Sequence, residues 1–325
     1  MLLLASFMTG RFSAWRDKWR RQSPGVPDDP EALIGRLAWF DCDAGSVVAA
    51  YRMASPSGIV FSRECLVVNS MMGNTITAFN PDLSIAWRIS HPLLCDLHSI
   101  VDSSGGYLIT SSGVDGALEF TPGGKLIWSW LAPEHGYSRT NAGGVRRINP
   151  LRHYGLQTPV TETQSTHCNS AVVVEPGSRG TVAMSLFHQG EVILIDRRSG
   201  RSKSVIQGLM HPHSLRRVGI DGWSVCDTGA NSIVLLDANL RPRRVIDGPF
   251  DWVQDALCET GSAVVMDVNH ARIVHVDIEK NVVMSTIDYT PEWKGYQLEP
   301  VPDWWASAAC LRQDNFALGA LGGRG

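Results

Sequence analysis

The chain has 325 residues, of which 44% are hydrophobic and 19% charged, and its formal net charge is -3. This composition is typical of a globular protein with a large buried core. The near-neutral balance argues against a nucleic-acid-binding protein, which would normally carry a basic patch or stripe. The seven cysteines form no Cys-x-x-Cys pair. Such an odd, unpatterned set favours reduced thiols in a cytoplasmic protein over a disulfide framework.

Residues 1–30 are expected to form a helix followed by a linker. From Leu4 the apolar residues recur at helical spacing, at Leu4, Met8, Phe12, Trp15 and Trp19, with basic residues off that stripe. A basic amphipathic helix with tryptophans can lie on a membrane surface, so residues 1–22 are a candidate for peripheral membrane contact. A helix packed on the body of the protein, or a frayed end, fits the same pattern. The apolar run is too short to span a bilayer, and no secretory signal is expected.

From residue 31 onward the sequence is typical of many short antiparallel strands. Most of the repeated segments are spaced by about 40 residues, the usual length of a four-stranded propeller blade. One step is longer because of an insert at residues 132–165. Six segments end an apolar run at a small polar turn residue, at 37–41, 76–80, 117–121, 192–196, 233–237 and 273–277.

We therefore predict an all-β fold, a six-bladed β-propeller over residues 31–325. The first unit supplies two strands, within 36–40 and 47–52, and the last supplies two more, within 306–311 and 316–321. Pairing of the two ends in one blade would close the ring and remove the exposed edge that an open arc leaves. A β-sandwich would not explain the period.

The innermost strand of each blade should line a central channel, and the residues at the heads of these strands should surround its mouth. Three consecutive blades offer histidine there, which argues against histidine as core filler, and the next offers an aspartate. The insert 132–165 leaves at the same end and could lie over the mouth as a lid. Aligning the repeats by their turn residues gives six positions, Gly58, His98, His167, His213, Asp255, and Ala306 or Ser307.

Two further residue types near these positions have more than one interpretation. Trp252 and Trp304 precede such positions and are either packing between blades or walls for an aromatic substrate. His188 lies further along its blade and is expected at the surface or between blades.

Two short motifs carry the most specific signal: Thr-His-Cys-Asn-Ser at residues 166–170 and His-Gln-Gly at residues 188–190. With weaker motifs at 97–100, 127–130, 213–214 and 227–229, they follow one another in the order found in the arylsulfotransferase-like six-bladed propellers, which the sequence resembles over blades two to four. The resemblance implies transfer of a sulfuryl group from an aryl sulfate to a phenol through a sulfated histidine, with no cofactor. It places the nucleophile at His213. His98 and His167 match the family's other active-site histidines, which assist as acid, base or oxyanion contacts.

The sequence departs from that family at one functional position. The family's arginine that binds the sulfuryl oxygens is replaced by Phe187, and a phenyl ring offers an anion no donor. Either another basic residue substitutes for it, or the donor is not a sulfate. The candidate substrate-binding residues are Arg217, Arg146, Arg147, Phe187, Asp255 and Asn169.

Three interpretations of the histidines stay open. If the protein is an enzyme, the expected partner is a small-molecule substrate, aromatic molecules included. The first is covalent group transfer, in which one neutral imidazole attacks and a second carries the proton. The second is a metal site, in which His98, His167 and His213 hold one Zn, Cu or Fe ion for a lyase, hydrolase or cyclase reaction. Asp255 would then be a fourth ligand or an orienting group. The third is a non-catalytic propeller that binds a metabolite or a protein.

Overall fold

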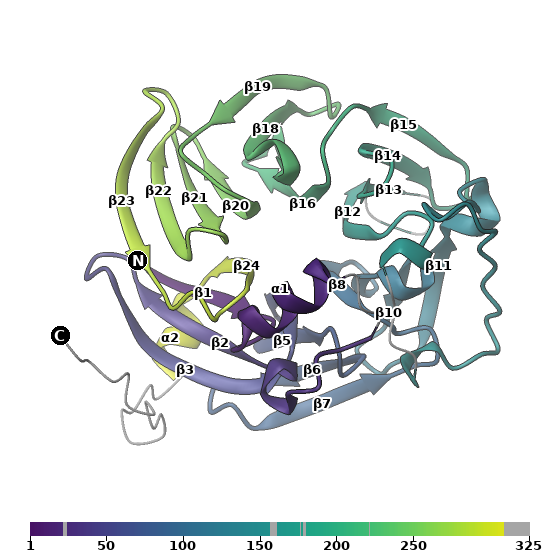
Figure 1. Ribbon diagram of the computed structural model, residues 1–325, viewed down its shortest axis with the longest axis horizontal. Coiled ribbons are helices and arrows are strands. Elements are labelled where there is room, and N and C mark those ends of the chain that lie inside the picture. Colours follow the sequence, from purple (N-terminus) through teal and green to yellow (C-terminus); the bar gives the residue numbers. More distant parts are fainter. Residues whose placement is uncertain (22–24, 157–160, 176, 178–179, 221, 309–325) are drawn as a thin grey trace.

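The computed structural model describes residues 1–21, 25–156, 161–175, 177, 180–220 and 222–308. These residues form six four-stranded antiparallel sheets arranged around a central channel, so the predicted six-bladed β-propeller is confirmed (Figure 1). Each blade contributes its innermost strand to the channel, and neighbouring innermost strands contact one another around the ring.

Five blades run in simple chain order from the channel outward. The second blade holds β4 (Pro56–Ser62), β5 (Cys65–Ser70), β6 (Thr75–Phe79) and β7 (Ile85–Ser90). The third holds β8 (Leu97–Ser103), β9 (Gly106–Ser111), β10 (Gly116–Phe120) and β11 (Leu126–Leu131). The fourth holds β12 (Cys168–Glu175), β13 (Thr181–Leu186), β14 (Glu191–Asp196) and β15 (Ser202–Ile206). The fifth holds β16 (Pro212–Val218), β17 (Gly222–Asp227), β18 (Ser232–Asp237) and β19 (Pro242–Asp247). The sixth holds β20 (Val253–Glu259), β21 (Ser262–Asp267), β22 (Arg272–Asp277) and β23 (Val282–Asp288).

The first blade closes the ring by joining the two ends of the chain, as predicted, but with a different division of strands. It runs from β24 (Gly295–Pro300) through β1 (Leu2–Phe7) and β2 (Ile34–Asp41) to β3 (Ser46–Ala54). Three strands thus come from the N-terminal region and one from the C-terminal region, where two of each were expected.

The predicted strand at residues 306–311 is wrong where the structure describes it. Residues Asp303–Ala308 form helix α2, which begins after Pro302 with an acidic residue in its first turn, a common helix start. The expected strand at 316–321 lies outside the described residues. The innermost strand is β24, in which Gln297 and Glu299 face the channel, so its apolar signal is weak.

The expected helix from Leu4 is also wrong in its first part. Leu2–Phe7 is strand β1, which pairs with β2 on one side and β24 on the other. Both faces of this strand are buried, so its apolar residues form a continuous run without the alternation of a half-exposed strand.

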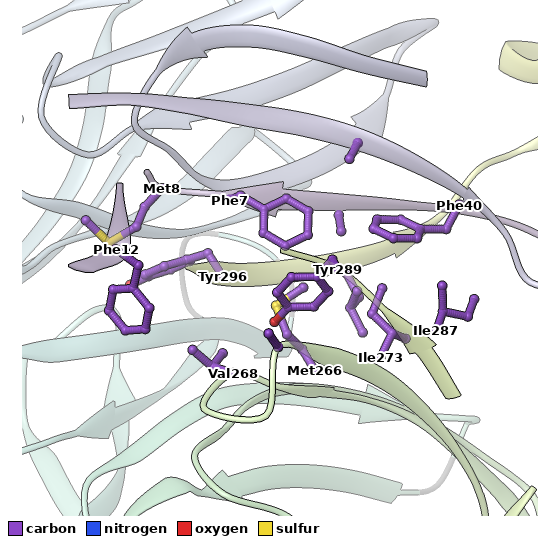
Figure 2. Packing of buried hydrophobic residues seen from close by; sticks show 14 of the residues in the cluster. Phe7, Met8, Phe12, Phe40, Met266, Val268, Ile273, Ile287, Tyr289 and Tyr296 are labelled. Atoms are coloured by element: carbon purple, nitrogen blue, oxygen red, sulfur yellow. The ribbon is translucent and has the colours of Figure 1, made fainter. Parts of the chain in front are cut away.

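A shorter helix, α1 (Phe12–Arg20), follows and packs on the propeller across the middle of the ring (Figure 1). Its Phe12 and Trp15 are buried in a cluster that also holds Phe7 and Tyr296 (Figure 2). The indole N–H of Trp15 donates to the carbonyl oxygen of Ala32 at 2.8 Å. The apolar stripe of α1 therefore faces the protein. Among the described residues, no helix is long and apolar enough to cross a membrane.

The insert between β11 and β12 is held to the ring by hydrogen bonds to backbone carbonyl oxygens. Tyr154 is buried, and its N–H donates to the carbonyl oxygen of Pro92 at 2.7 Å. The Asn74 amide donates to the carbonyl oxygen of Gly155 at 3.0 Å.

Candidate functional site

The innermost strands begin in matching register, which defines two sets of equivalent positions at one end of the channel. In every blade the first residue of the innermost strand makes the first pair with the second strand. The residue just before that pair is called the rim position, and the residue just after it the throat position. The rim residues are Ser55, Asp96, His167, His211, Trp252 and Lys294. The throat residues are Ser57, His98, Asn169, His213, Gln254 and Tyr296.

This register corrects the alignment made from turn residues. His98 and His213 are equivalent throat residues, but His167 belongs to the rim, and Asn169 is the throat residue of its blade. Gly58 and Asp255 each lie one residue beyond the throat position, and the first blade supplies Tyr296 in place of Ala306 or Ser307. Loops between blades differ in length, so a pattern of turns cannot fix the strand register to one residue.

The rim carries an unusual backbone conformation. Five of its residues, Ser55, Asp96, His167, His211 and Trp252, have φ between 31° and 66°. Side chains other than glycine rarely adopt this left-handed region, and it is costly for a bulky residue such as tryptophan. The repetition of this conformation shows that the chain enters the innermost strand by an equivalent turn in five blades.

The rim and throat open into a cavity of about 890 Å³. This volume suits a small-molecule site. Helix α1 covers it with Phe12, Trp15, Arg16 and Trp19, while the insert adds Asn141, Thr161 and Glu162. Its floor and walls are lined by Asp96, His98, His167, Phe187, His188, His211, His213, Trp252, Lys294 and Tyr296. A narrower space of about 80 Å³ continues from His98, His213 and Tyr296 down the polar channel.

Asp96, His98 and Tyr296 form a connected chain on one side of the cavity. The Nε2 atom of His98 lies 3.4 Å from Oδ1 of Asp96, and its Nδ1 is hydrogen-bonded to the Tyr296 hydroxyl. Burial raises the pKa of Asp96, but its interactions with His98 and the amide of Gln164 outweigh that effect and keep the pKa below its usual value. Asp96 is therefore a buried carboxylate at neutral pH.

His167 is held in one tautomer by its neighbours. Its Nδ1 is hydrogen-bonded to Oε1 of Gln164, a carbonyl oxygen that only accepts, so Nδ1 carries the proton and Nε2 is bare. Burial, with smaller contributions from neighbouring histidines and Lys294, lowers the pKa of His167 well below the usual value. The rings of His98 and His167 meet edge to face, with centroids 4.7 Å apart.

The segment that carries His167 is anchored by one buried carboxylate. Asp115 accepts backbone N–H groups from Ser165, Thr166 and His167 at 2.7–3.0 Å. Arg146 completes the anchor by donating from Nε to Asp115 at 2.8 Å.

His213 is also fixed in one tautomer. Its Nδ1–H donates to the backbone carbonyl oxygen of His211 at 3.0 Å, which leaves Nε2 unprotonated. Burial, then the nearby His98 and Lys294, lower the pKa of His213 well below its usual value. The ring of Phe187 stacks on the ring of His211, with the centroids 4.3 Å apart. It meets the ring of His213 edge to face, with the centroids 5.5 Å apart.

Lys294 is a rim residue that the sequence did not reveal, because the last innermost strand was expected further along the chain. Its ammonium lies 5.0 Å from the ring centroid of Trp19 and 5.8 Å from that of Tyr296. Burial lowers the pKa of Lys294 to about 8, against an opposing effect of Asp96. The alternation of Tyr296 and Leu298 after a Lys-Gly turn was the available signal.

The three arginines expected to bind an anion are not among the residues that line the cavity. Arg146 pairs with Asp115, Arg217 lies over the Trp223 ring at 5.0 Å, and Arg147 is exposed. The cations that line the cavity are Arg16 and Lys294.

The other predicted site residues divide between the cavity and the channel. Phe187 and Trp252 line the cavity, and so does His188, contrary to its expected place at the surface or between blades. Asn169 lines the narrow channel below. Asp255 is buried in an ion pair with Arg216 at 2.7 Å, which makes it part of the channel's internal structure.

Comparison with known proteins supports the fold alone. No protein-family model matches the chain, and no curated protein matches it. A solved structure of virginiamycin B lyase from Staphylococcus aureus is similar, with 11% identity over 80% of this chain and 78% of that chain and a TM-score of 0.53. A protein of unknown function from Bacteroides caccae has 14% identity over 81% and 93% of the two chains, with a TM-score of 0.58. A chain of a nidogen/laminin complex has 12% identity over 92% and 97%, with a TM-score of 0.56.

Proposed function

We propose that the protein is an arylsulfotransferase-like enzyme that moves a sulfuryl group between small aromatic molecules through His213. One observation carries this proposal: the Nδ1–H of His213 is bound to a backbone carbonyl, so its bare Nε2 is the free atom of the ring at the cavity. Because the pKa of His213 is lowered, the ring is neutral and nucleophilic at physiological pH.

The proposed reaction has two steps, which balance with the aryl sulfate donor and the acceptor phenol as the only reactants. In the first, Nε2 of His213 attacks the sulfur of an aryl sulfate; the N–S bond forms as the S–O bond to the aryl group breaks. The phenolate that leaves takes a proton from Lys294, whose pKa near 8 suits proton transfer at neutral pH. In the second, an acceptor phenol returns a proton to Lys294 and its oxygen attacks the sulfur, which breaks the N–S bond and restores His213.

The composition of the cavity supports an aromatic, anionic substrate. Trp19, Phe187 and Trp252 give the walls flat apolar faces on which an aryl ring can stack. Lys294 and Arg16 supply positive charge near the histidines. In this proposal they take over the anion-binding role of the arginine that Phe187 replaces.

The test is direct detection of a sulfated His213. The purified protein is mixed with 4-nitrophenyl sulfate, quenched in alkali, and analysed by intact mass and peptide mapping. We expect one added SO3 group on the peptide that carries His213 and a stoichiometric burst of nitrophenol. His213→Ala should show neither, because the substitution removes the bare Nε2 that the proposal assigns as the nucleophile.

His275→Ala is the matched control, since His275 lies on β22 and does not line the cavity. It should label as the parent protein does. Equal nitrophenol release by His213→Ala and the parent would overturn the proposal, and so would an unlabelled parent protein with several aryl sulfate donors.

A further inference from the structure

We infer that Asp96, His98 and His167 form a binding site for one divalent transition-metal ion of the Zn(II) or Fe(II) class. This inference goes beyond the proposed function and its test does not depend on it. The three residues are buried, and one ligand atom from each lies within 4.8 Å of the other two. All three line the cavity, so open coordination positions would face a bound molecule.

The donor set indicates the class of metal. Two imidazole nitrogens and one carboxylate oxygen suit Zn(II), Fe(II) or Co(II), whereas Mg(II) and Ca(II) prefer sites made of oxygen. The Nε2 of His98 and Oδ1 of Asp96 are already 3.4 Å apart. Two ligands bound to a tetrahedral zinc ion at about 2.0–2.2 Å lie roughly 3.3–3.6 Å from each other. This pair therefore needs little movement to share an ion.

The groups around the three ligands are arranged as they are in metal sites. Ligating residues usually have their other polar atom held by an outer hydrogen bond, which fixes tautomer and orientation. Gln164 holds two of them, since its Oε1 accepts from Nδ1 of His167 and its Nε2 donates to Oδ2 of Asp96 at 3.0 Å. The Tyr296 hydroxyl holds Nδ1 of His98. Each Nε2 and one carboxylate oxygen are thereby left for the ion.

This ligand set differs from the set of three histidines, His98, His167 and His213, that the sequence suggested. His213 is outside the cluster, and its own Nδ1 is already bound to the His211 carbonyl. A metal ion and a free His213 nucleophile can therefore coexist in one cavity. If the proposed function holds, the ion bound to Nε2 of His167 would also supply positive charge to a sulfuryl oxygen, to which that nitrogen by itself offers no N–H donor.

The experiment uses the full chain without a histidine tag, stripped with chelator and then titrated with Zn(II) by calorimetry and with Co(II) by visible spectroscopy. We expect one equivalent of metal and the d–d bands of a Co(II) ion in a protein site. Asp96→Asn and His167→Gln should weaken binding at least 100-fold. Gln164→Ala should weaken it by roughly 10- to 100-fold, because it removes the outer contact to two ligands.

His213→Gln and His188→Gln are the matched controls, since both residues line the same cavity outside the ligand set. They should keep the parent affinity. Circular dichroism and thermal melts without metal show whether Asp96→Asn and His167→Gln are folded, and Gln164→Ala tests the site without touching a ligand.

A parent protein that binds no metal overturns the inference, as does loss of binding in His213→Gln equal to that in His167→Gln. A labelled His213 in a protein without metal affinity would leave the proposed function standing and remove the metal site.

Discussion

At the scale of single residues, the cavity joins neutral histidines to a lysine that is easily deprotonated. His213 is held neutral by burial, whereas Lys294, between the rings of Trp19 and Tyr296, keeps its proton up to a pH of about 8. A nucleophile and a proton carrier are therefore both in their working forms at neutral pH.

The pH profile of activity should report Lys294. Its pKa of about 8 predicts that kcat/KM falls above that pH, because the ammonium that protonates the leaving group is lost. Lys294→Arg should keep the positive charge and remove this alkaline limb, since arginine does not deprotonate in that range. Lys294→Met should lower kcat by roughly 100- to 10,000-fold. Steady-state rates with phenyl sulfate, whose phenolate is basic enough to need the proton, measure all three between about pH 6 and 10. An unchanged limb in Lys294→Arg would exclude Lys294 as the acid.

Individual residues also show where sequence reasoning succeeds and where it ends. His98 and His213 were recognisable because each follows the start of an apolar run in a repeat. Asp96, Lys294 and Tyr296 were not, because their roles depend on strand register and on which strand closes the ring. Phe187 was singled out because it stands where the arylsulfotransferase-like propellers carry an arginine, but its stacking on His211 is a tertiary contact that no spacing encodes.

At the scale of elements, helix α1 forms the roof of the cavity. Its buried Phe12 and Trp15 join the core, whereas Trp19 is 47% exposed and covers the ammonium of Lys294. All three side chains line the cavity, but Phe12 and Trp15 also belong to the hydrophobic core, and Trp19 does not. Substitution of Trp19 should therefore affect binding more than folding.

Trp19→Ala should weaken binding of an aromatic ligand with little loss of stability. Removal of one aromatic face costs about 0.5–1.5 kcal/mol of binding, so the dissociation constant of an aryl sulfonate should rise by roughly 3- to 10-fold. Trp304→Ala is the control, because Trp304 is 40% exposed on α2 and does not line the cavity. Calorimetry with the sulfonate measures the dissociation constants of the parent and both variants. Equal affinities of Trp19→Ala and the parent would show that Trp19 does not contact the ligand.

The elements that the sequence predicted well are those that repeat along the chain. The six repeated segments all lie in the third strand from the channel, which packs between neighbouring blades. Strand β1 lies outside these repeats and is buried on both faces, so it has neither a repeat nor an alternation to distinguish it from a helix. Strand β24 was missed because half of it is polar channel lining.

At the scale of the whole molecule, the lowered pKa of His213 links stability to pH. In the unfolded chain this histidine takes up a proton as the pH falls through its ordinary pKa of about 6.5. In the folded protein it does so only at a much lower pH. The unfolded state therefore binds more protons below about pH 6.5, and the free energy of unfolding falls as the pH decreases through that range.

The contribution of His213 should be about 1.4 kcal/mol per pH unit below about pH 6.5. Urea unfolding at several pH values, down to the range where carboxylates titrate, measures this slope. His213→Gln should make the slope shallower, whereas His275→Gln on β22 should leave it as in the parent. A slope that does not change in His213→Gln would mean that the histidine is protonated equally in both states.

The closing blade has a consequence for the protein while it is being made. Phe7 and Gly295 bound the two paired strands and are separated by 287 residues of chain. At about 5–20 residues per second, a ribosome needs roughly 15–60 s to supply that length. During this time the inner edge of β1 has no partner, and an apolar strand with an open edge is prone to pair with another chain. Chaperone capture of the nascent polypeptide should therefore be strongest just before β24 emerges from the exit tunnel.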